Sequence, residues 1–333
     1  MFCVNNKSRY VRITKMDKIL IICGPTATGK TDLGIYLAKK FDGEIISADS
    51  RQVYRGMDIG TGKFSKDDKV EKFDGKLRIN DVFVNLVDVY DPKEQFSASD
   101  FVKLAGKKIN ELWQKVKLPI VVGGTGFYIN ALIYGMDNLN IPADQKLREK
   151  LEGKYKKFGV ESLYQKLLTL DPPKAKSLNE SDRQNPRRLI RAIEIASTKK
   201  PQANTVKNYS KVDILEVGLI VQKDRLYKLI DERVDKRLGQ GMIEEVESLI
   251  KKGVSFSRLD QFGLEYRWIG KFLEGKISKE EMKIGLKNDI HDFARRQMVW
   301  FKRDSKIHWF DPSDPNFLQE VENLVEKWLN MAN

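Results

Sequence analysis

Apolar and polar positions follow two recurring patterns along the first half of the chain. Short and mainly apolar runs occur at residues 18–23, 44–48 and 118–122, and runs of this length are typical of buried strands rather than of helices. Residues 30–41, which follow the first run, carry apolar side chains at helical spacing. Short buried strands that alternate with helices indicate an α/β fold in which helices cover both faces of a parallel sheet.

The pattern changes in the middle of the chain. Between about residues 133 and 203 it is helical and rich in Lys, whereas residues 212–221 again have the pattern of a strand. We therefore predict that an all-helical insertion interrupts the α/β core and that the chain then returns to the sheet. The predicted organisation is a tail at 1–15, an α/β core at 16–132, a helical insertion at 133–205, and a return to the core with C-terminal helices at 206–333.

The positive charge of the chain is unevenly distributed. The formal net charge is +13, and residues 144–208 contain 16 Lys and Arg against 8 Asp and Glu. This segment is about a fifth of the chain and carries more than half of the excess charge. Such a concentration favours a polyanionic partner, with nucleic acid the first candidate, over a surface that is basic only for solubility.

Composition excludes several other classes of protein. No apolar run is long enough to cross a bilayer, and the basic first 15 residues lack the apolar centre of a secretory signal. Translation could begin at Met1 or at Met16. The two cysteines, Cys3 and Cys23, and the two histidines do not form a disulfide framework or a zinc cluster. We therefore expect a cytoplasmic enzyme.

The segment GPTATGKT, residues 24–31, follows the first predicted strand and opens the first predicted helix. In this context the Gly-x-x-x-x-Gly-Lys-Thr spacing is typical of a phosphate-binding loop, in which backbone N–H groups and the helix N-terminus hold phosphate oxygens. Lys30 adds a point charge, and the hydroxyl of Thr31 suits Mg²⁺ as a metal ligand. The predicted phosphate-binding residues are Gly24, Pro25, Thr26, Ala27, Thr28, Gly29, Lys30 and Thr31.

A second element of nucleotide hydrolases, an apolar strand that ends in a magnesium-binding Asp, is not evident. One predicted strand ends in the Gly-Gly-Thr sequence at 123–125, and the segment EIISADS reaches Asp49. Because no water-activating signature is present either, the loop need not serve ATP hydrolysis. Asp49 lies at the carboxyl end of a predicted strand, where open α/β sheets place ligand contacts. Its carboxylate would bind Mg²⁺ or accept a proton from a nucleophile.

Four ordered segments of the chain resemble the signature segments of tRNA dimethylallyltransferases. They are GPTATGKT (24–31), ADSRQVYRGMDIGTGK (48–63), VVGGTGFYINAL (121–132) and NPRRLIRAIEI (185–195). The resemblance runs from about residue 18 to the C-terminal helices. It implies a P-loop NTPase-like α/β fold with a tRNA-binding helical insertion. It also implies transfer of a dimethylallyl group from dimethylallyl diphosphate to N6 of the adenine 3′ to the anticodon, with release of diphosphate.

The resemblance also implies cofactors, partners and residue roles. Mg²⁺ is the implied cofactor, and the implied partners are the anticodon stem-loop of tRNA and dimethylallyl diphosphate, with no membrane and a monomeric enzyme. Asp49 would orient the adenine amine and take its proton. Lys30, Thr31 and Arg233 complete the implied catalytic set, and Arg233 is a better candidate for a diphosphate contact than Arg225. The implied tRNA-binding residues are Asp49, Ser50, Arg51, Gln52, Thr125, Arg148, Arg187, Arg188 and Arg191.

Some of these residues also have a structural interpretation. Thr125 would serve equally as the N-cap of a helix at 126–134. Asn185 and Pro186 suit the cap and first turn of a helix whose arginines either bind phosphates or form a solvated face. The segment QFGLEYR at 261–267 stands where many family members have Gly-Tyr-Lys, so contacts assigned to that stretch are not carried over.

Three alternatives remain open from the sequence. The same chemistry could act on free AMP or ATP, although the basic insertion favours a partner with more phosphates than a mononucleotide has. A P-loop small-molecule kinase would use Asp49 for its substrate and the arginines at 187–191 as a lid. A non-enzymatic RNA-binding protein would not need Lys30, Thr31 and Asp49. The chain has no C-terminal Cys/His zinc module, so a bacterial-type enzyme is expected.

Overall fold

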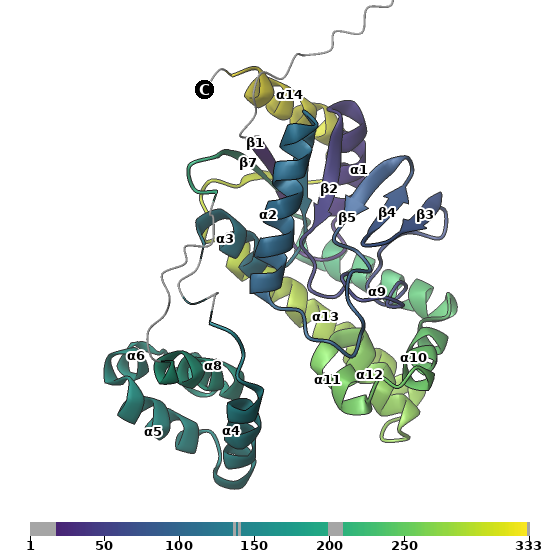
Figure 1. The fold of residues 1–333 in the computed structure, drawn as a ribbon. Helices are drawn as coiled ribbons and strands as arrows, with labels where there is room; N and C mark the ends of the chain where they lie inside the picture. The colour runs from purple at the N-terminus through teal and green to yellow at the C-terminus, as the bar shows by residue number, and fades with distance from the viewer. Residues whose placement is uncertain (1–17, 136–137, 139–140, 199–208, 332–333) are drawn as a thin grey trace, which may run out of the picture. The chain divides into compact units, whose positions relative to one another are not determined.

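The computed structural model describes residues 18–135, 138, 141–198 and 209–331 (Figure 1). The predicted tail at 1–15 lies outside these residues. The chain divides into two compact units: a core unit, Met1–Ile133 with Tyr209–Asn333, and a helical unit, Tyr134–Asn208. Among the described residues, no helix combines the length and the apolar composition that a membrane span requires.

The core unit is built on an eight-stranded sheet with the order β3-β4-β5-β2-β6-β1-β7-β8. Its centre is parallel: β2 pairs with β6, β6 with β1, and β1 with β7. These central strands, which the apolar runs predicted, are β1 (Lys18–Cys23), β2 (Gly43–Ser47), β6 (Leu118–Val122) and β7 (Asp213–Leu219). The predicted α/β class is therefore confirmed.

Three strands at one edge were not predicted. They are β3 (Val70–Phe73), β4 (Lys76–Ile79) and β5 (Val82–Asn85). The pairs β3/β4 and β4/β5 are antiparallel, so the sheet is mixed rather than wholly parallel. These strands have only four residues each; β3 and β4 mix charged with apolar side chains, and β5 has three apolar residues followed by Asn85. Their register depends on tight turns, one of them with positive φ at both Asn80 and Asp81, a geometry that favours hairpins.

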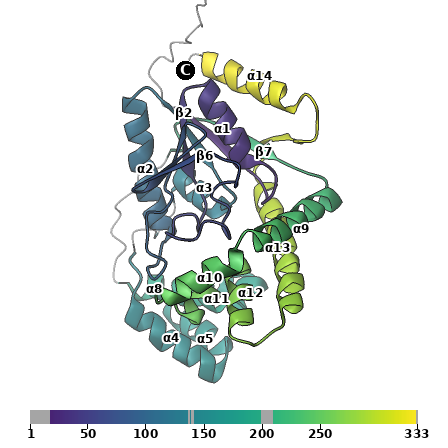
Figure 2. The same ribbon diagram turned by 90° about the vertical axis from the view of Figure 1, so that its right-hand side faces the viewer.

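Helices cover both faces of the sheet, as predicted (Figure 2). On one face, α1 and α14 share a hydrophobic core with the strands, which includes Leu37, Ile120 and Val325. On the other face, α2 packs against β2 and β6. The helices and the remaining strand are α1 (Lys30–Lys40), α2 (Ala98–Gln114), α3 (Gly126–Tyr134), α14 (Phe317–Asn330) and β8 (His308–Phe310), which pairs with β7.

Five further helices form a second core beyond the carboxyl ends of the parallel strands (Figures 1 and 2). Their buried side chains pack with Val53, Tyr54 and Met57 from the segment that follows β2. This contact brings the C-terminal helices against the loops that end the central strands. The helices are α9 (Lys223–Gly239), α10 (Met242–Lys251), α11 (Phe256–Phe262), α12 (Leu264–Leu273) and α13 (Lys279–Phe301).

The helical unit has helices and connecting segments but no strand among its described residues. It has a small hydrophobic core of its own. Its last helix begins as predicted: the Asn185 side chain accepts a hydrogen bond from Arg188 N at 3.2 Å, and Pro186 occupies the first turn. The predicted end of the insertion, at 205, lies outside the described residues. The helices are α4 (Gln145–Phe158), α5 (Glu161–Leu170), α6 (Pro172–Ser177), α7 (Glu180–Arg183) and α8 (Pro186–Ser197).

Candidate active site

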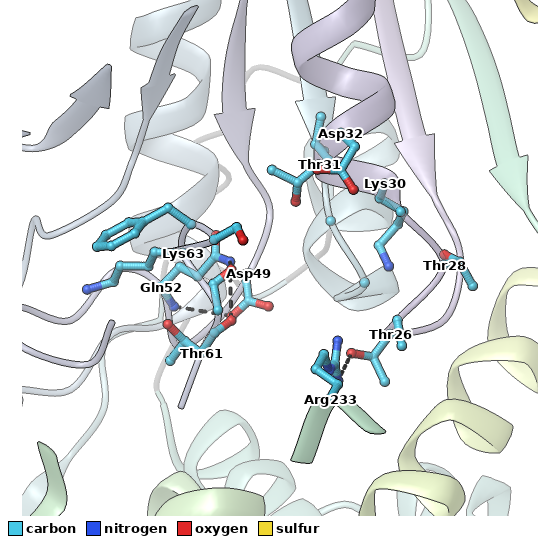
Figure 3. Close-up of a pocket in the computed structure, with 18 of the residues that line it drawn as sticks. Thr26, Thr28, Lys30, Thr31, Asp32, Asp49, Gln52, Thr61, Lys63 and Arg233 are labelled. Atoms are coloured by element: carbon cyan, nitrogen blue, oxygen red, sulfur yellow. Dashed lines mark hydrogen bonds between the residues drawn. The ribbon is translucent and has the colours of Figure 1, made fainter. Parts of the chain in front are cut away.

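A cavity of about 420 Å³ lies in the core unit at the carboxyl ends of the central strands. Its walls come from the loop between β1 and α1, the segments after β2 and β6, and helices α9 and α13. Figure 3 shows Lys30 and Arg233 facing Asp49, Gln52 and Thr61 across this space. Three of the four signature segments, at 24–31, 48–63 and 121–132, contribute residues to this cavity. The fourth, at 185–195, belongs to the helical unit.

The loop between β1 and α1 has the conformation of an anion-binding loop. Gly24 has φ 129°, and a side chain there would come within 2.5 Å of the Leu219 carbonyl oxygen. Gly29, the N-cap of α1, has φ 83° and is left-handed, a conformation that glycine adopts at little cost. The hydroxyl of Thr28 donates to the Pro25 carbonyl at 2.9 Å and fixes the turn. The α1 N-terminus therefore opens into the cavity and can hold an anion.

Lys30 and Arg233 bring two positive charges together at this loop. Lys30 Nζ donates to the Pro25 carbonyl at 2.5 Å and forms no salt bridge with a described carboxylate. Burial, together with the charge of Arg233, lowers the pKa of Lys30 to about 8. Burial, together with the charge of Arg237, lowers the pKa of Arg233. Both cations are therefore destabilised by their surroundings and would be stabilised by a bound anion.

Arg233 lines the cavity and also has one buried donor without a partner among the described residues. Its Nη2 donates to Thr26 Oγ1 at 2.8 Å, whereas its buried Nε has no hydrogen-bond partner among the described residues. A buried donor without a partner costs about 1–3 kcal/mol. The Arg233 side chain lines the cavity, so an oxyanion bound there can contact its guanidinium, and the diphosphate role of Arg233 remains a prediction.

Asp49 has one fixed and one uncommitted oxygen. Its Oδ1 accepts hydrogen bonds from the backbone N–H groups of Arg51 at 2.8 Å and Gln52 at 3.2 Å. Its Oδ2 accepts none from a described residue. These two hydrogen bonds form an Asx-turn, in which an Asp side chain accepts from backbone N–H groups that follow it in the chain. The carboxylate lines the cavity, so the second oxygen is available to a substrate.

The residues after Asp49 are engaged mainly within the protein. Gln52 accepts from Ser47 Oγ at 2.8 Å, and its Nε2 lies 3.4 Å from the Thr61 carbonyl and 3.3 Å from that of Gly62. Arg51 Nε donates to the Phe262 carbonyl at 2.7 Å. Their predicted contacts with tRNA, like that of the half-buried Ser50, stay predictions.

Thr125 lies outside the set of residues that line the cavity. Helix α3 begins at Gly126 as predicted, but no hydrogen bond of the Thr125 side chain with a described residue is present. Its carbonyl accepts the N–H groups of Tyr128 and Ile129 at 2.9 and 3.2 Å. The expected side-chain cap is therefore not seen, and the hydroxyl stays a predicted tRNA contact.

Gln297 of α13 belongs to the site, and the sequence interpretation missed it. Its Oε1 accepts the Thr26 N–H at 2.9 Å, and its Nε2 donates to the Gly124 carbonyl at 2.9 Å. It therefore ties the phosphate-binding loop to the loop after β6. A signal was present in the sequence, because this glutamine continues a stripe of buried apolar residues that includes Ile290 and Ala294.

Two predicted tRNA-binding arginines form salt bridges inside the helical unit. Arg148 donates to both carboxylate oxygens of Glu194, at 2.7 and 2.8 Å. Arg191 donates to Glu194 at 3.1 Å and to the carbonyls of Asn138 and Ile141 at 2.9 and 2.8 Å. The Glu194 side chain is only 1% exposed. These two arginines therefore stabilise the helical unit through the buried Glu194, and their contact with tRNA stays a prediction.

The other two arginines of α8 lie on its surface. Arg188 is exposed and forms a salt bridge with Asp182. Arg187 is exposed and forms no salt bridge with a described residue. The guanidinium of Arg191 on the same helix contacts Glu194, Asn138 and Ile141, and the tRNA contacts of all three arginines stay predictions.

Two family models and several curated proteins match this chain. The family model described as IPP transferase matches residues 52–304, and the model described as Isopentenyl transferase matches residues 17–79. A tRNA dimethylallyltransferase from Alkaliphilus oremlandii is 41% identical over 313 residues, which is 93% of this chain and 95% of the relative. One from Acetivibrio thermocellus is 40% identical over 304 residues, which is 90% of this chain and 93% of the relative.

Solved structures are similar as well. The full-length tRNA isopentenylpyrophosphate transferase from Bacillus halodurans matches with a TM-score of 0.66 and 34% identity, over 94% of this chain and 97% of that chain. A eukaryotic dimethylallyltransferase acting on tRNA matches at 23% identity with a TM-score of 0.72, and this likeness concerns the fold. The predicted fold class is confirmed by these neighbours. The chain belongs to the tRNA dimethylallyltransferase family.

Proposed function

We propose that this enzyme transfers a dimethylallyl group from dimethylallyl diphosphate to N6 of the adenine 3′ to the anticodon in tRNA and releases diphosphate. The observation that carries the proposal is the placement of Lys30 and Arg233 at the phosphate-binding loop, opposite the Asp49 carboxylate. The Oδ2 atom of that carboxylate has no hydrogen-bond partner among the described residues. Family membership supports the same chemistry. The geometry offers an anion cradle on one side of the cavity and a proton acceptor on the other.

The cradle would act on the leaving group. As the allylic C–O bond breaks, negative charge builds on the diphosphate, and its oxygens would accept hydrogen bonds from the loop N–H groups, Lys30 and Arg233. Donors fixed before the reaction stabilise such developing charge, and removal of one costs about 10²–10³-fold in rate in well-studied enzymes.

Asp49 would act on the acceptor. The exocyclic amine of adenine is a weak nucleophile, and it must lose a proton when its nitrogen bonds to the allylic carbon. The Oδ1 atom of Asp49 is fixed by two backbone N–H groups, which leaves Oδ2 to orient the amine and accept that proton as a general base. Because the target adenine lies in a loop, it can leave the stack at a cost of a few kcal/mol.

We propose Mg²⁺ as the cofactor, with Thr31 as its protein ligand. The donor chemistry fits: Thr31 lines the cavity, its hydroxyl has no hydrogen-bond partner among the described residues, and the carboxylates of Asp32 and Asp68 line the same space. Mg²⁺ prefers oxygen ligands and usually combines few protein groups with substrate phosphates. When bound, the ion would neutralise part of the diphosphate charge.

The helical unit is the proposed surface for the anticodon stem-loop. Its excess of positive charge and the exposed Arg187 and Arg188 on α8 support binding to a polyanion. We also propose that the enzyme works as a monomer. We propose the cytoplasm as its compartment, where tRNA is modified.

A competition experiment tests the proposal. The enzyme is incubated with isotopically labelled dimethylallyl diphosphate, Mg²⁺ and an equimolar mixture of unmodified tRNA and AMP. We expect the label in the tRNA adenine next to the anticodon. Label found only on AMP would replace the tRNA substrate by a mononucleotide. ATP turnover without any prenyl transfer would replace the function by that of a kinase.

A further inference from the structure

The loop formed by residues 58–62 contributes to the reaction site. Thr61 and Gly62 line the main cavity, and Gly60 and Thr61 line a smaller neighbouring cavity of about 50 Å³. Figure 3 shows Thr61 beside Gln52 and Asp49. The carbonyls of Thr61 and Gly62 accept from the Gln52 side chain, so this 58–62 loop is linked by hydrogen bonds to the turn that presents Asp49.

A single carboxylate from a distant helix holds the 58–62 loop. Glu245 of α10 accepts hydrogen bonds from three consecutive backbone N–H groups: those of Asp58 at 2.7 Å, Ile59 at 2.6 Å and Gly60 at 3.0 Å. Consecutive N–H groups that converge in this way form an anion-binding nest, and hydrogen bonds to a charged acceptor are stronger than neutral ones. Glu245 itself lines neither cavity.

The segment that departs from the common family pattern completes this arrangement. The hydroxyl of Tyr266 donates to Glu245 at 2.8 Å, and its ring closes on Gly60, where an added Cβ would lie 2.7 Å from the hydroxyl oxygen. In the preceding residue, the Oε1 atom of Glu265 lies 3.6 Å from Nη1 of Arg237. The same nitrogen donates to the Gly60 carbonyl at 3.0 Å. Two neighbouring residues of α12 therefore support both the N–H side and the carbonyl side of the loop.

We infer that Glu245 is a positioning residue: its carboxylate fixes the 58–62 loop and, through Gln52, the orientation of Asp49 toward the acceptor amine. The inference rests on the proposed function for its catalytic consequence. Glu245 does not touch the substrate, so its loss should lower the rate of the chemical step and leave substrate binding nearly unchanged. Misplacement of a reacting group by about 1 Å is enough to cost about 10²-fold in rate.

The test compares Glu245→Ala with Glu244→Ala, a control that removes the exposed carboxylate of the preceding residue. We expect a fall of about 10²-fold in the single-turnover rate for Glu245→Ala, KM values for both substrates within about twofold of wild type, and no change for the control. Tyr266→Phe removes one hydrogen bond to the same carboxylate. It should lower the rate in the same direction by less, and it provides the test if Glu245→Ala does not fold.

Hydrogen exchange gives a readout that does not depend on activity. In Glu245→Ala the N–H groups of residues 58–60 should exchange faster, while those of the phosphate-binding loop at 24–31 should keep their wild-type rates. The inference would be overturned if Glu245→Ala kept the wild-type exchange rate at 58–60 or the wild-type transfer rate. It would also be overturned if the variant lost rate, tRNA affinity and protection throughout the core unit in parallel. If wild-type enzyme transfers no prenyl group, the proposed function fails, and exchange alone then judges the role of Glu245 in holding the loop.

Discussion

Replacement of Glu194 by Ala tests the structural role of the arginines in the helical unit. The carboxylate accepts two hydrogen bonds from Arg148, one from Arg191 and one from the Asp144 N–H at 3.0 Å. Its side chain is 1% exposed, so the negative charge is stabilised almost wholly by these donors. The substitution leaves two guanidinium groups without their shared partner, and we expect the helical unit to open more often.

The expected magnitude follows from the burial of the three groups. Loss of one partner from a buried ion pair costs about 3–5 kcal/mol. The side chains of Arg148 and Arg191 are 26% and 33% exposed and can regain part of their hydration, so the lower end, about 3 kcal/mol, applies. Since each 1.4 kcal/mol is tenfold in an equilibrium constant, opening of the unit should become about 10²-fold more frequent.

Hydrogen exchange followed by mass spectrometry measures this opening within the intact chain. Peptides from α4 and α8 should exchange about 10²-fold faster in Glu194→Ala, whereas peptides from the central strands of the core unit should not change. Glu149→Ala is the matched control, because Glu149 is exposed and forms one hydrogen bond to Gln145 on the surface of α4. Unchanged protection of α4 and α8 in Glu194→Ala would refute the role assigned to the buried carboxylate.

The same carboxylate predicts a pH dependence. Burial acts to raise the pKa of Glu194, but hydrogen bonds from Arg148 and Arg191 outweigh it, and the net pKa is below the ordinary value. A depressed pKa in the folded state means that the stabilisation is present above the unfolded pKa of about 4.3 and is lost as the pH falls through the folded value. The difference in exchange between wild type and Glu194→Ala should therefore shrink in acid below about pH 4.

Three further outcomes are expected in the active site and on α8. Asp49→Ala should lower the single-turnover rate by about 10²-fold and leave tRNA affinity nearly intact, and equal losses of rate and affinity would contradict a general base. The double variant Arg187→Ala with Arg188→Ala should weaken tRNA binding and reduce the slope of log K against log salt by about two, and an unchanged slope would exclude phosphate contacts by both. Because the pKa of Lys30 is lowered to about 8, KM for dimethylallyl diphosphate should rise as the pH rises through about 8. Lys30→Arg should remove that rise, since Arg stays protonated, and a KM that is flat with pH in wild type would contradict a role for the Lys30 charge.

Local patterns predicted the parts of the fold that depend on local physics. The central strands were identified because each is a continuous buried run, and α8 because Asn185 and Pro186 mark its first turn. Strands β3 and β4 were missed because they mix charged with apolar side chains, and β5 because its apolar run is only three residues long. Their pairing depends on the turn at Asn80 and Asp81. For the same reason the antiparallel edge of the sheet was not expected.

The candidate site shows a similar division. Lys30 and Asp49 follow strands directly, so their place at the edge of the sheet was predictable. Gln297 contacts Thr26, and Glu245 contacts Asp58, each more than 180 residues away in the chain. The stripe of buried residues on α13 marks Gln297 as buried, but no local pattern identifies the partner of either residue. Arg191 shows the opposite difficulty, because an arginine on a helix looks the same in sequence whether it meets a phosphate or a buried carboxylate.

Nucleoside mass spectrometry of tRNA from cells with and without this gene bears on the whole mechanism at once. If the Lys30 and Arg233 cradle releases a dimethylallyl group to an adenine amine readied by Asp49, N6-dimethylallyl adenosine and its derivatives should be absent from the tRNA of cells that lack the gene. Wild-type enzyme should restore them, and Asp49→Ala should not restore them to a normal level. Persistence of the modified nucleoside in cells without the gene, or its full restoration by Asp49→Ala, would contradict the mechanism.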